Sequence, residues 1–379
     1  MNRVMIVAGE ASGDLHGSNL VRAAMDLDPG LEFYGLGGGK MKAAGVDLLF
    51  DLERQGLAGF AEIITSLSSA LKTLKTLKAS LERDRPSGLV LIDYPDFNLN
   101  LAKTANNLNI PVFYYISPQV WAWRRGRVEK IKRLVNQMVV VFPFEVDYYR
   151  EHGFEVSFVG HPLLDVMGPP RPKGEVKAEL GFDSSTPLLV LLPGSRMAEI
   201  RQHLSLMLEC ASAVRNQVPG LSLAVAQADT STTEQLSPFI EGFPIDVKLV
   251  KGRTHALQNA ADVVLTASGT ATLETALMLT PMVVIYRVRL LTHLLIKRLV
   301  KVEHAAIVNL IAGERLVPEF LQKEAHPDRI TAELLRLLNE PEKRAKMIDG
   351  LKRVREKLGA PGGSGRAAAL LLETIRRET

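Results

Sequence analysis

The sequence predicts an α/β protein made of two Rossmann-like halves, each built around a parallel sheet. Short, β-rich apolar runs closed by Gly or Pro alternate with helical patterns along most of the chain. Such a βαβ series forms parallel sheets, because each crossover returns the chain to the same end of the sheet. The chain has 379 residues, too many for one ordinary core, so two domains are expected.

The individual strands follow from this pattern. The first series places them at residues 4–9, 31–38, 88–95, 110–117, 137–143 and 156–162, and the second at 187–195, 221–228, 245–252, 262–269 and 281–288. Between the series, GPPRPKGE at 168–175 is rich in Pro, Gly and charge, which is typical of a linker. We therefore expect domains at 1–167 and 176–355.

The end of the chain, 356–379, combines a Gly-rich joint with an Ala/Leu helix. This helix has an apolar face with no obvious place in the second domain. We expect it to pack on the first domain or on a partner chain.

Composition excludes several classes of function. The single cysteine, Cys210, allows no internal disulfide, and its helical context favours a buried, inert thiol. The chain shows no signal peptide and no run of about 18 apolar residues, so we expect a cytosolic or membrane-surface protein. The net charge of +4 is mild and spread out, which fits an anionic partner but gives no reason to expect nucleic acid.

The sequence also lacks the common signatures of metal and serine hydrolase sites. The eight histidines are scattered and have neither a cysteine partner nor HxxH spacing, and GxSxG is absent. We expect no metal and no cofactor.

Two loops in the second half have the character of phosphate-binding sites. LLPGSR ends a strand and opens a helix, so Gly194 and Ser195 can offer backbone N–H groups to an anion, and Arg196 adds a cation. A capped helix with a surface arginine is the plainer alternative.

The second loop lies in TASGTATLE. Ser268, Gly269 and Thr270 follow a strand and allow close approach of a diphosphate. Glu274 lies one helical turn further and suits a ribose diol. The alternative is a variant of the capping box.

The first half offers carboxylates where strands end. In VLIDYPDFN we favour Asp93 as a general base and Asp96 as a helix cap. Glu10 and Asp14, in the opening stretch GEASGD, are the competing carboxylates. Two doubly wound domains would share one cleft at their carboxyl edges, and GEASGD would face this cleft.

Aromatic and histidine residues of the first half are weaker candidates. Trp121 and Trp123 lie beside an arginine run and suit sugar stacking or a lipid phosphate, although a core cluster is equally compatible. His161 follows a strand and precedes a proline, which favours a structural histidine bonded to the backbone.

Residues 56–80 resemble an amphipathic helix that lies on a membrane. The apolar residues with helical spacing are Ile63, Ile64, Leu67, Leu71 and Leu74, and Lys72, Lys75 and Lys78 follow at every third position. An ordinary helix that covers the sheet would show a similar pattern.

Nine motifs in order carry a family resemblance. They are GEASGD, IDYPDFN, YYISPQVWAWR, PFEVDYY, VGHPLLD, LLPGSR, ASGTATLE, PMVVIYR and VPEFLQ. From about residue 4 to the C-terminal helix, the chain resembles the lipid-A-disaccharide synthase family. The resemblance implies the GT-B glycosyltransferase fold, with two Rossmann-like domains facing a central cleft.

The same resemblance implies transfer of 2,3-diacylglucosamine from its UDP derivative to 2,3-diacylglucosamine 1-phosphate. The product would be the β-1,6-linked precursor of lipid A, made by an inverting enzyme on the cytoplasmic face of the inner membrane. It further implies an interlocked homodimer that uses the C-terminal segment.

Site residues are carried over by position. Asp93 matches the family's essential aspartate, with Glu10 as the competing base. Arg196, Glu274 and Asn309 match UDP-contacting positions, but Val308 replaces the proline that commonly precedes this asparagine. The expected UDP loops are Gly194–Arg196 and Ser268–Thr270. Acceptor contacts are expected from Gly9, Ser12, Gly13, Asp14, Trp121 and Trp123, and membrane contacts from Ile63, Ile64, Leu67 and Leu71.

Two other functions share the expected fold. A soluble UDP-N-acetylglucosamine epimerase would carry its own acid/base carboxylates and a histidine in the cleft. We find no motif for these residues in the sequence. A two-domain solute-binding protein would normally carry a signal peptide.

Overall fold

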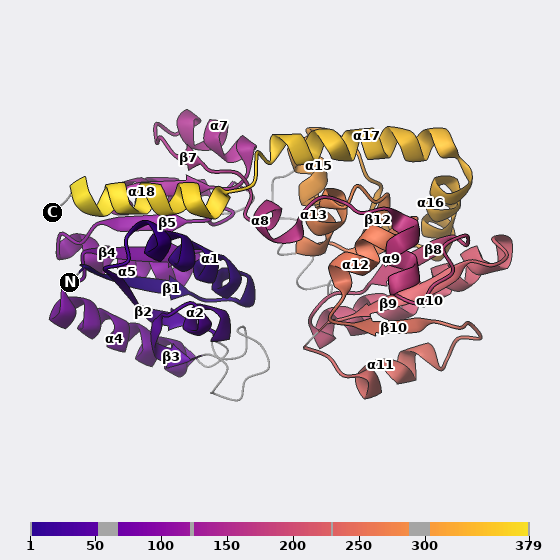
Figure 1. Cartoon of the computed structure of the whole chain (residues 1–379), viewed down its shortest axis with the longest axis horizontal. Helices are drawn as coiled ribbons and strands as arrows, with labels where there is room; N and C mark the ends of the chain where they lie inside the picture. Colours follow the sequence, from indigo (N-terminus) through magenta and orange to yellow (C-terminus); the bar gives the residue numbers. More distant parts are fainter. Residues whose placement is uncertain (1, 52–66, 122–124, 229, 288–303, 378–379) are drawn as a thin grey trace. The chain divides into compact units, whose positions relative to one another are not determined.

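The computed structural model describes residues 2–51, 67–121, 125–228, 230–287 and 304–377 (Figure 1). The chain forms two compact units. The first comprises Met1–Asp165 together with Leu358–Thr379, and the second comprises Val166–Lys357. The chain therefore leaves the first unit after one sheet, builds the second, and returns to the first at its end.

The first unit is built on a seven-stranded parallel sheet of order β3-β2-β1-β4-β5-β6-β7. The strands are β1 (Asn2–Ala8), β2 (Leu31–Gly37), β3 (Asp47–Asp51), β4 (Gly88–Ile92), β5 (Val112–Tyr115), β6 (Gln137–Val140) and β7 (Ser157–Phe158). β1 and β4 are neighbours, and their last paired residues are Ala8 and Ile92. Strand order reverses at this pair, as in a dinucleotide-binding fold.

Helices cover both faces of this sheet (Figure 1). They are α1 (Ala11–Leu27), α2 (Gly39–Ala43), α4 (Leu67–Asp84), α5 (Pro95–Asn107), the 3-10 helix η1 (Arg125–Arg127), α6 (Val128–Leu134), α7 (Pro143–Glu151) and α18 (Gly363–Arg377). Alternate residues of each strand point to opposite faces. Val4 and Ile6 thus pack with α1 and α18, whereas Met5 and Val7 pack with α4 and α5.

The C-terminal helix α18 lies against α1 in the first unit. Asp165 fixes its start, because the two carboxylate oxygens accept hydrogen bonds from the backbone N–H groups of Gly362, Gly363 and Ser364 and from the Ser364 hydroxyl. Ala367, Ala368 and Leu371 then fill the core beside the sheet.

The second unit has a six-stranded parallel sheet of order β10-β9-β8-β11-β12-β13. Its strands are β8 (Leu188–Leu192), β9 (Ser222–Gln227), β10 (Lys248–Lys251), β11 (Val263–Ala267), β12 (Met282–Tyr286) and β13 (Glu319–Leu321). Strand order reverses between β8 and β11, so this unit has the same topology at its centre as the first.

The helices of the second unit alternate with these strands. They are α9 (Lys173–Glu179), α10 (Met197–Gln217), α11 (Thr233–Ile240), α12 (Thr254–Ala260), α13 (Thr270–Leu277), α15 (Ile307–Ala312), the 3-10 helix η2 (Gln322–Glu324), α16 (Pro327–Asn339) and α17 (Pro341–Lys357). The short helix α8 (Leu163–Met167) carries the chain from the first unit into the second. Cys210 is buried in α10, and burial raises the pKa of its thiol to about 12.

All the predicted strands are present, and the structure adds two. β3 at Asp47–Asp51 and β13 at Glu319–Leu321 are edge strands that the apolar pattern did not indicate. The predicted linker also differs from the structure. Residues 168–175 belong to the second unit, where the backbone of Arg171 exchanges two hydrogen bonds with the Asn259 side chain and Lys173 begins α9.

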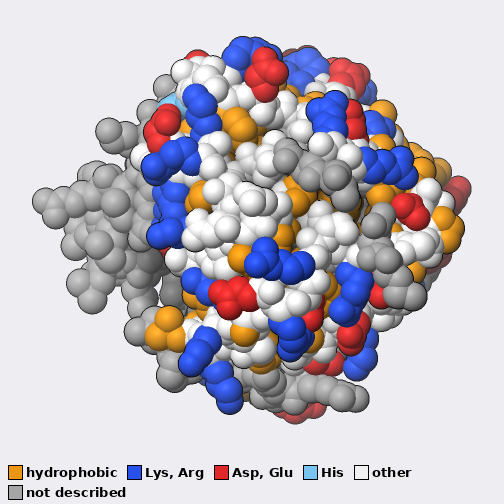
Figure 2. Space-filling model, turned by 90° about the vertical axis from the view of Figure 1, so that its left-hand side faces the viewer, with side chains coloured by type: hydrophobic (Ala, Val, Ile, Leu, Met, Phe, Trp, Pro, Cys, Tyr) orange, Lys and Arg blue, Asp and Glu red, His pale blue; other side chains and the backbone are white. Residues whose placement is uncertain are grey.

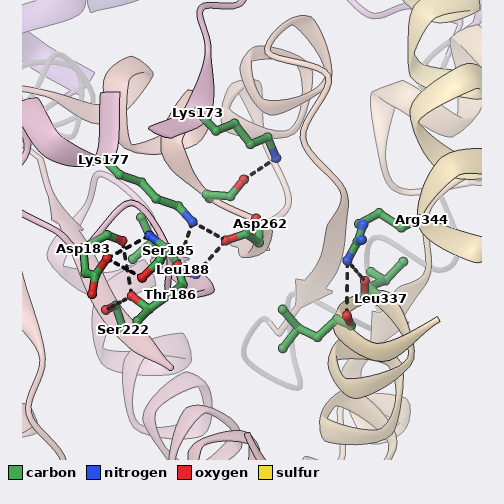
Figure 3. A network of polar contacts seen from close by, with 12 residues as sticks. Lys173, Lys177, Asp183, Ser185, Thr186, Leu188, Ser222, Asp262, Leu337 and Arg344 are labelled. Atoms are coloured by element: carbon green, nitrogen blue, oxygen red, sulfur yellow. Dashed lines mark hydrogen bonds and ion pairs between the residues drawn. The ribbon is translucent and has the colours of Figure 1, made fainter. Parts of the chain in front are cut away.

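The ion pair between Lys177 and Asp262 lies at the start of the central strands of the second sheet (Figure 3). The Lys177 ammonium donates to the Asp262 carboxylate and to the Thr186 carbonyl oxygen, both at 2.7 Å. Asp262 also accepts a hydrogen bond from the backbone N–H of Leu188, at 2.8 Å. Because Leu188 begins β8 and Asp262 precedes β11, this cluster ties α9 to the two central strands.

On the face drawn in Figure 2, Lys and Arg are spread among acidic and apolar residues. Among the described residues, no helix combines the length and the apolar character needed to cross a bilayer.

The buried ion pair gives a stability prediction. Lys177→Met leaves the Asp262 carboxylate without its cation in a mostly buried position, so we expect the free energy of unfolding to fall by about 3 kcal/mol. Urea unfolding followed by circular dichroism measures this loss. Lys352→Met removes an exposed ion pair with Asp349 in the same unit and should change stability little. Equal losses in the two variants would contradict a structural role for the Lys177 pair.

Candidate functional site

The carboxyl ends of β1 and β4 bring two carboxylates to one place in the first unit. Asp93 directly follows β4, Glu10 is the second residue after β1, and both are half-buried. Ligands of open α/β sheets bind where strand order reverses, because the loops diverge there and leave space. The structure therefore places both predicted carboxylates at the expected edge of the sheet.

Asp93 has a strained and well-supported backbone. Asp93 and Tyr94 both have φ of 46°, in the left-handed region that side chains with a Cβ disfavour. The carbonyl oxygen of Asp93 accepts hydrogen bonds from Asn98 Nδ2 at 2.7 Å and from the Tyr114 hydroxyl at 2.5 Å. Strained backbone of this kind is concentrated at functional sites.

The electrostatic environment suits Asp93 to proton transfer. Burial raises the pKa of the Asp93 carboxyl to about 6, with a further upward contribution from the Glu10 carboxylate, while a backbone hydrogen bond from Tyr94 acts in the opposite direction. A carboxylate with a pKa near 6 is ionised at neutral pH and is a stronger base than an exposed one.

The glycines of GEASGD serve internal packing. A Cβ on Gly9 would lie 2.8 Å from the Tyr94 ring. Just after the motif, a Cβ on Gly17 would lie 2.8 Å from Met41 Sδ. Gly13 is buried against Ala8 and Ile92. The absence of a Cβ at Gly9 is therefore explained by packing inside the protein, and contact of Gly9 and Gly13 with the acceptor stays a prediction.

Asp14 also has a structural role. Its buried carboxylate accepts hydrogen bonds from the backbone N–H groups of Gly38, Lys40 and Met41, at 2.8, 3.0 and 3.0 Å. These bonds cap α2 and occupy the carboxylate that we expected to bind sugar. Ser12, in the first turn of α1, is exposed and remains a candidate contact.

Of the two tryptophans predicted to contact the acceptor, the structure describes only Trp121, and it has a structural role. Trp121 is buried, and its indole N–H donates to the Glu145 carboxylate at 3.1 Å, so it belongs to the core and not to a stacking surface. Burial raises the pKa of Glu145 to about 8, against hydrogen bonds that include those from Phe142 and Trp121. Trp123 lies outside the described residues.

His161 is structural, as expected. It is buried, its Nδ1 accepts a hydrogen bond from the Leu163 backbone, and its ring lies 6.5 Å from that of His16, centroid to centroid. Burial lowers the pKa of both rings, to about 3 for His161 and about 4 for His16. Both are therefore neutral at physiological pH.

In the second unit, the two predicted phosphate loops follow the neighbouring strands β8 and β11. In the first loop, Gly194 has φ of 119° and leads into α10. The Glu199 carboxylate accepts a hydrogen bond from the Ser195 N–H at 3.1 Å and a longer one from the Arg196 N–H at 3.4 Å. An anion from the chain thus lies where an anionic ligand was predicted.

The second loop is more open. Gly269 and Thr270 are exposed at the start of α13, and a Cβ on Gly269 would meet nothing within 4 Å. Ser268 donates its hydroxyl hydrogen to the Ala305 carbonyl. Glu274 lies 3.4 Å from His255 Nε2, and its carboxylate raises the pKa of that ring.

Asn309 does not fit the predicted contact with UDP. The side chain is fully buried, donating to the Val317 carbonyl at 3.0 Å and accepting from the Val317 N–H at 2.9 Å. Both ends of the amide are therefore used within the protein. The neighbouring Val308 is also fully buried. Glu319 of VPEFLQ supports the same region, because it accepts hydrogen bonds from the backbone N–H groups of Ala305 and Ala306.

The predicted membrane helix is described only in part. Ile63 and Ile64 lie outside the described residues, and so does the side chain of Leu67, which begins α4. Leu71 is 57% exposed on α4, next to the exposed Lys72. Leu74, one turn further, packs against the core.

The structure adds site residues that the sequence did not indicate. Asn98 and Tyr114 hold Asp93, Glu199 occupies the first phosphate loop, and His255 pairs with Glu274. Glu199 is the third residue of α10, a position where glutamate often caps a helix, but the N-cap residue is Arg196 and not the Ser or Thr of the usual capping-box motif, so the sequence offered no clear signal for it. Within the described part of the chain, no cluster of His, Cys, Asp and Glu could hold a metal ion.

Comparison with known proteins identifies the family. The model of the lipid-A-disaccharide synthetase family matches residues 4–371. The chain belongs to this family. It is therefore a glycosyltransferase of lipid A biosynthesis, as the nine motifs predicted.

Individual relatives agree over the whole chain. The lipid-A-disaccharide synthase of Geobacter metallireducens is 46% identical over 376 residues, covering 99% of this chain and 98% of that protein. The enzyme of Myxococcus xanthus is 42% identical over 373 residues, covering 98% and 97%.

Solved structures of other proteins share the fold. The UDP-GlcNAc 2-epimerase from Neisseria meningitidis bound to UDP-GlcNAc has a TM-score of 0.57 and 10% identity, covering 99% of this chain and 100% of that chain. A spinosyn rhamnosyltransferase complexed with thymidine diphosphate has a TM-score of 0.60 and 13% identity, covering 98% and 99%. At these identities the likeness shows the fold alone, which confirms the predicted GT-B class.

Proposed function

We propose that this glycosyltransferase moves 2,3-diacylglucosamine from its UDP derivative to the 6-hydroxyl of 2,3-diacylglucosamine 1-phosphate. The reaction is an inverting single displacement, because the donor is α-linked to UDP and the product is β-linked. The pair of coupled carboxyl groups where strand order reverses in the first sheet, Asp93 and Glu10, is the observation that carries this proposal.

Asp93 is the general base of the proposed reaction. Its carboxylate takes the proton of the acceptor hydroxyl as that oxygen attacks the anomeric carbon and the bond to UDP breaks. The neighbouring Glu10 carboxylate raises the pKa of Asp93 and so increases its basicity. Glu10 and Ser12 are the remaining candidates for contacts with acceptor hydroxyls.

The second unit binds UDP in this proposal. Arg196 and the N–H groups that begin α10 and α13 stabilise the charge on the departing diphosphate. The diphosphate then replaces the Glu199 carboxylate at the N–H of Ser195. Glu274 accepts hydrogen bonds from the ribose diol, and His255 orients it.

The base assignment is tested by substitution. Asp93→Asn removes the proton acceptor at nearly constant shape, so we expect turnover to fall by about 1000-fold. UDP affinity should stay within about twofold of wild type because Asp93 belongs to the other half of the chain. Release of UDP from the two lipid substrates measures turnover, and calorimetry with UDP measures binding.

The neighbouring exposed carboxylate offers a matched control. Asp96→Asn changes a residue on the surface of α5 that pairs with Arg127, and turnover should remain close to wild type. Normal turnover in Asp93→Asn would remove Asp93 from the mechanism.

The pKa of Asp93 gives a pH prediction. The base must be ionised, so kcat/KM of the wild type should fall as the pH drops through about 6. Glu10→Gln removes a negative neighbour, which makes ionisation of Asp93 easier and should move this acidic limb to lower pH. A limb that stays in place in Glu10→Gln would show that Glu10 does not influence the base.

We also propose that the enzyme works on the cytoplasmic face of the inner membrane, where acylated substrates reside. Leu71 with the exposed Lys72 and Lys75 supports this, because apolar and basic side chains together suit an anionic lipid surface. A homodimer that shares the C-terminal segment is proposed from the family resemblance. Light scattering that found only monomers would refute it.

Vesicle binding tests the membrane proposal. Replacing Ile63, Ile64 and Leu67 together by Ser should weaken binding to vesicles of anionic phospholipid, because apolar surface no longer enters the lipid. Co-sedimentation measures the bound fraction. Leu27→Ser changes an exposed leucine at the end of α1 and should leave binding unchanged. Unchanged binding in the triple variant would refute a docking role for this segment.

A further inference from the structure

Asp93 and the residue after it lie in the left-handed backbone region, which residues with a Cβ adopt uncommonly. Asp93 and Tyr94 are consecutive residues with φ of 46°, and neither is glycine. They form the junction between β4 and α5. Two left-handed residues in sequence persist only where neighbouring groups hold them.

Two buried side chains supply that support. Asn98 Nδ2 donates to the Ile92 carbonyl at 3.1 Å and to the Asp93 carbonyl at 2.7 Å. The Tyr114 hydroxyl donates to the same Asp93 oxygen, from the neighbouring strand β5. Two donors from different elements thus meet on one carbonyl group, that of the proposed base.

We propose that Asn98 and Tyr114 are positioning residues, which fix the backbone of Asp93 so that its carboxylate is held ready for the acceptor hydroxyl. This inference rests on the proposed function of Asp93. Neither side chain takes part in the chemistry, since both act through the main-chain oxygen of Asp93.

The burial of Asn98 supports a dedicated role. The residue is fully buried, and in the described part of the chain its Oδ1 has no hydrogen-bond partner. A buried amide with an unpaired oxygen is costly, whereas leucine has nearly the same shape and would avoid that cost. The benefit of asparagine at this position is therefore the Nδ2 donor, which is directed at Asp93.

Support of the backbone also affects the ionisation of Asp93. The Glu10 carboxylate, from the loop after β1, raises the pKa of the Asp93 carboxyl, and Asp93 in turn raises the pKa of Tyr114 in β5 and of Glu145 in α7. Burial is the largest cause of the raised pKa. If the loop relaxes, Asp93 gains solvent and its pKa returns toward that of an exposed carboxyl.

Paired substitutions test the proposal in the full-length enzyme. Asn98→Leu removes the donor at constant shape, and Tyr114→Phe removes a single hydroxyl. We expect each to lower kcat by about 10- to 100-fold through misplacement of the base. KM should stay within about twofold, and the acidic limb of kcat/KM should move to lower pH.

The chain offers a matched control for each variant. Asn100 lies on the same helix and donates to the Asp96 carbonyl on the surface, so Asn100→Leu should leave kcat unchanged. Tyr115 is the next residue of β5 and is equally buried, so Tyr115→Phe should also leave kcat unchanged. Thermal unfolding should give similar midpoints for Tyr114→Phe and Tyr115→Phe.

Combination with Asp93→Asn separates this inference from the proposed function. If Asn98 and Tyr114 act through Asp93, their substitution should cause no further loss of kcat in the Asp93→Asn background. Wild-type kcat and an unchanged acidic limb in both single variants would overturn the positioning role. If Asp93→Asn were inactive in the same experiment, the assignment of Asp93 as the general base would still hold. An active Asp93→Asn would instead overturn the proposed function itself.

Discussion

The parallel pairing of two central strands is the constraint on which each unit depends. β1 with β4, and β8 with β11, stand where strand order reverses. The loops that follow such a pair turn to opposite faces of the sheet and leave their first residues exposed at its edge. Residues far apart in the sequence, such as Glu10 and Asp93, meet for this reason alone. The Lys177–Asp262 pair fixes the opposite edge of the second sheet, and thus the start of both central strands.

Acidic side chains satisfy the starts of helices throughout the structure. Asp14 caps α2, Asp165 caps α18, Glu199 caps α10 and Glu319 supports the start of α15. Each carboxylate accepts N–H groups that have no partner within their own helix. A helix start therefore attracts an anion from the chain as readily as one from a ligand, and the sequence alone does not distinguish the two cases.

This ambiguity explains which site predictions the structure changed. The sequence predicted the strands well, because long apolar runs leave few alternatives. It missed β3 and β13, because an edge strand is short and mixes apolar with charged residues. Gly9, Asp14 and Asn309 were predicted as ligand contacts, but their partners Tyr94, Met41 and Val317 come from elsewhere in the fold. A family motif identifies a position, whereas the hydrogen bonds at that position decide its role.

Asp93 shows which properties of a site residue can be predicted from the sequence and which are seen only in the structure. Its place after a buried strand could be predicted, since such strands end at the edge where ligands bind. Its left-handed backbone and its dependence on Asn98 and Tyr114 could not, because the hydroxyl comes from another strand. Burial makes ionisation of the carboxyl unfavourable, and Glu10 adds to that cost. The same two effects that raise the pKa of Asp93 make its carboxylate a stronger base, so the fold carries local strain and unfavourable charge at the residue proposed as the general base.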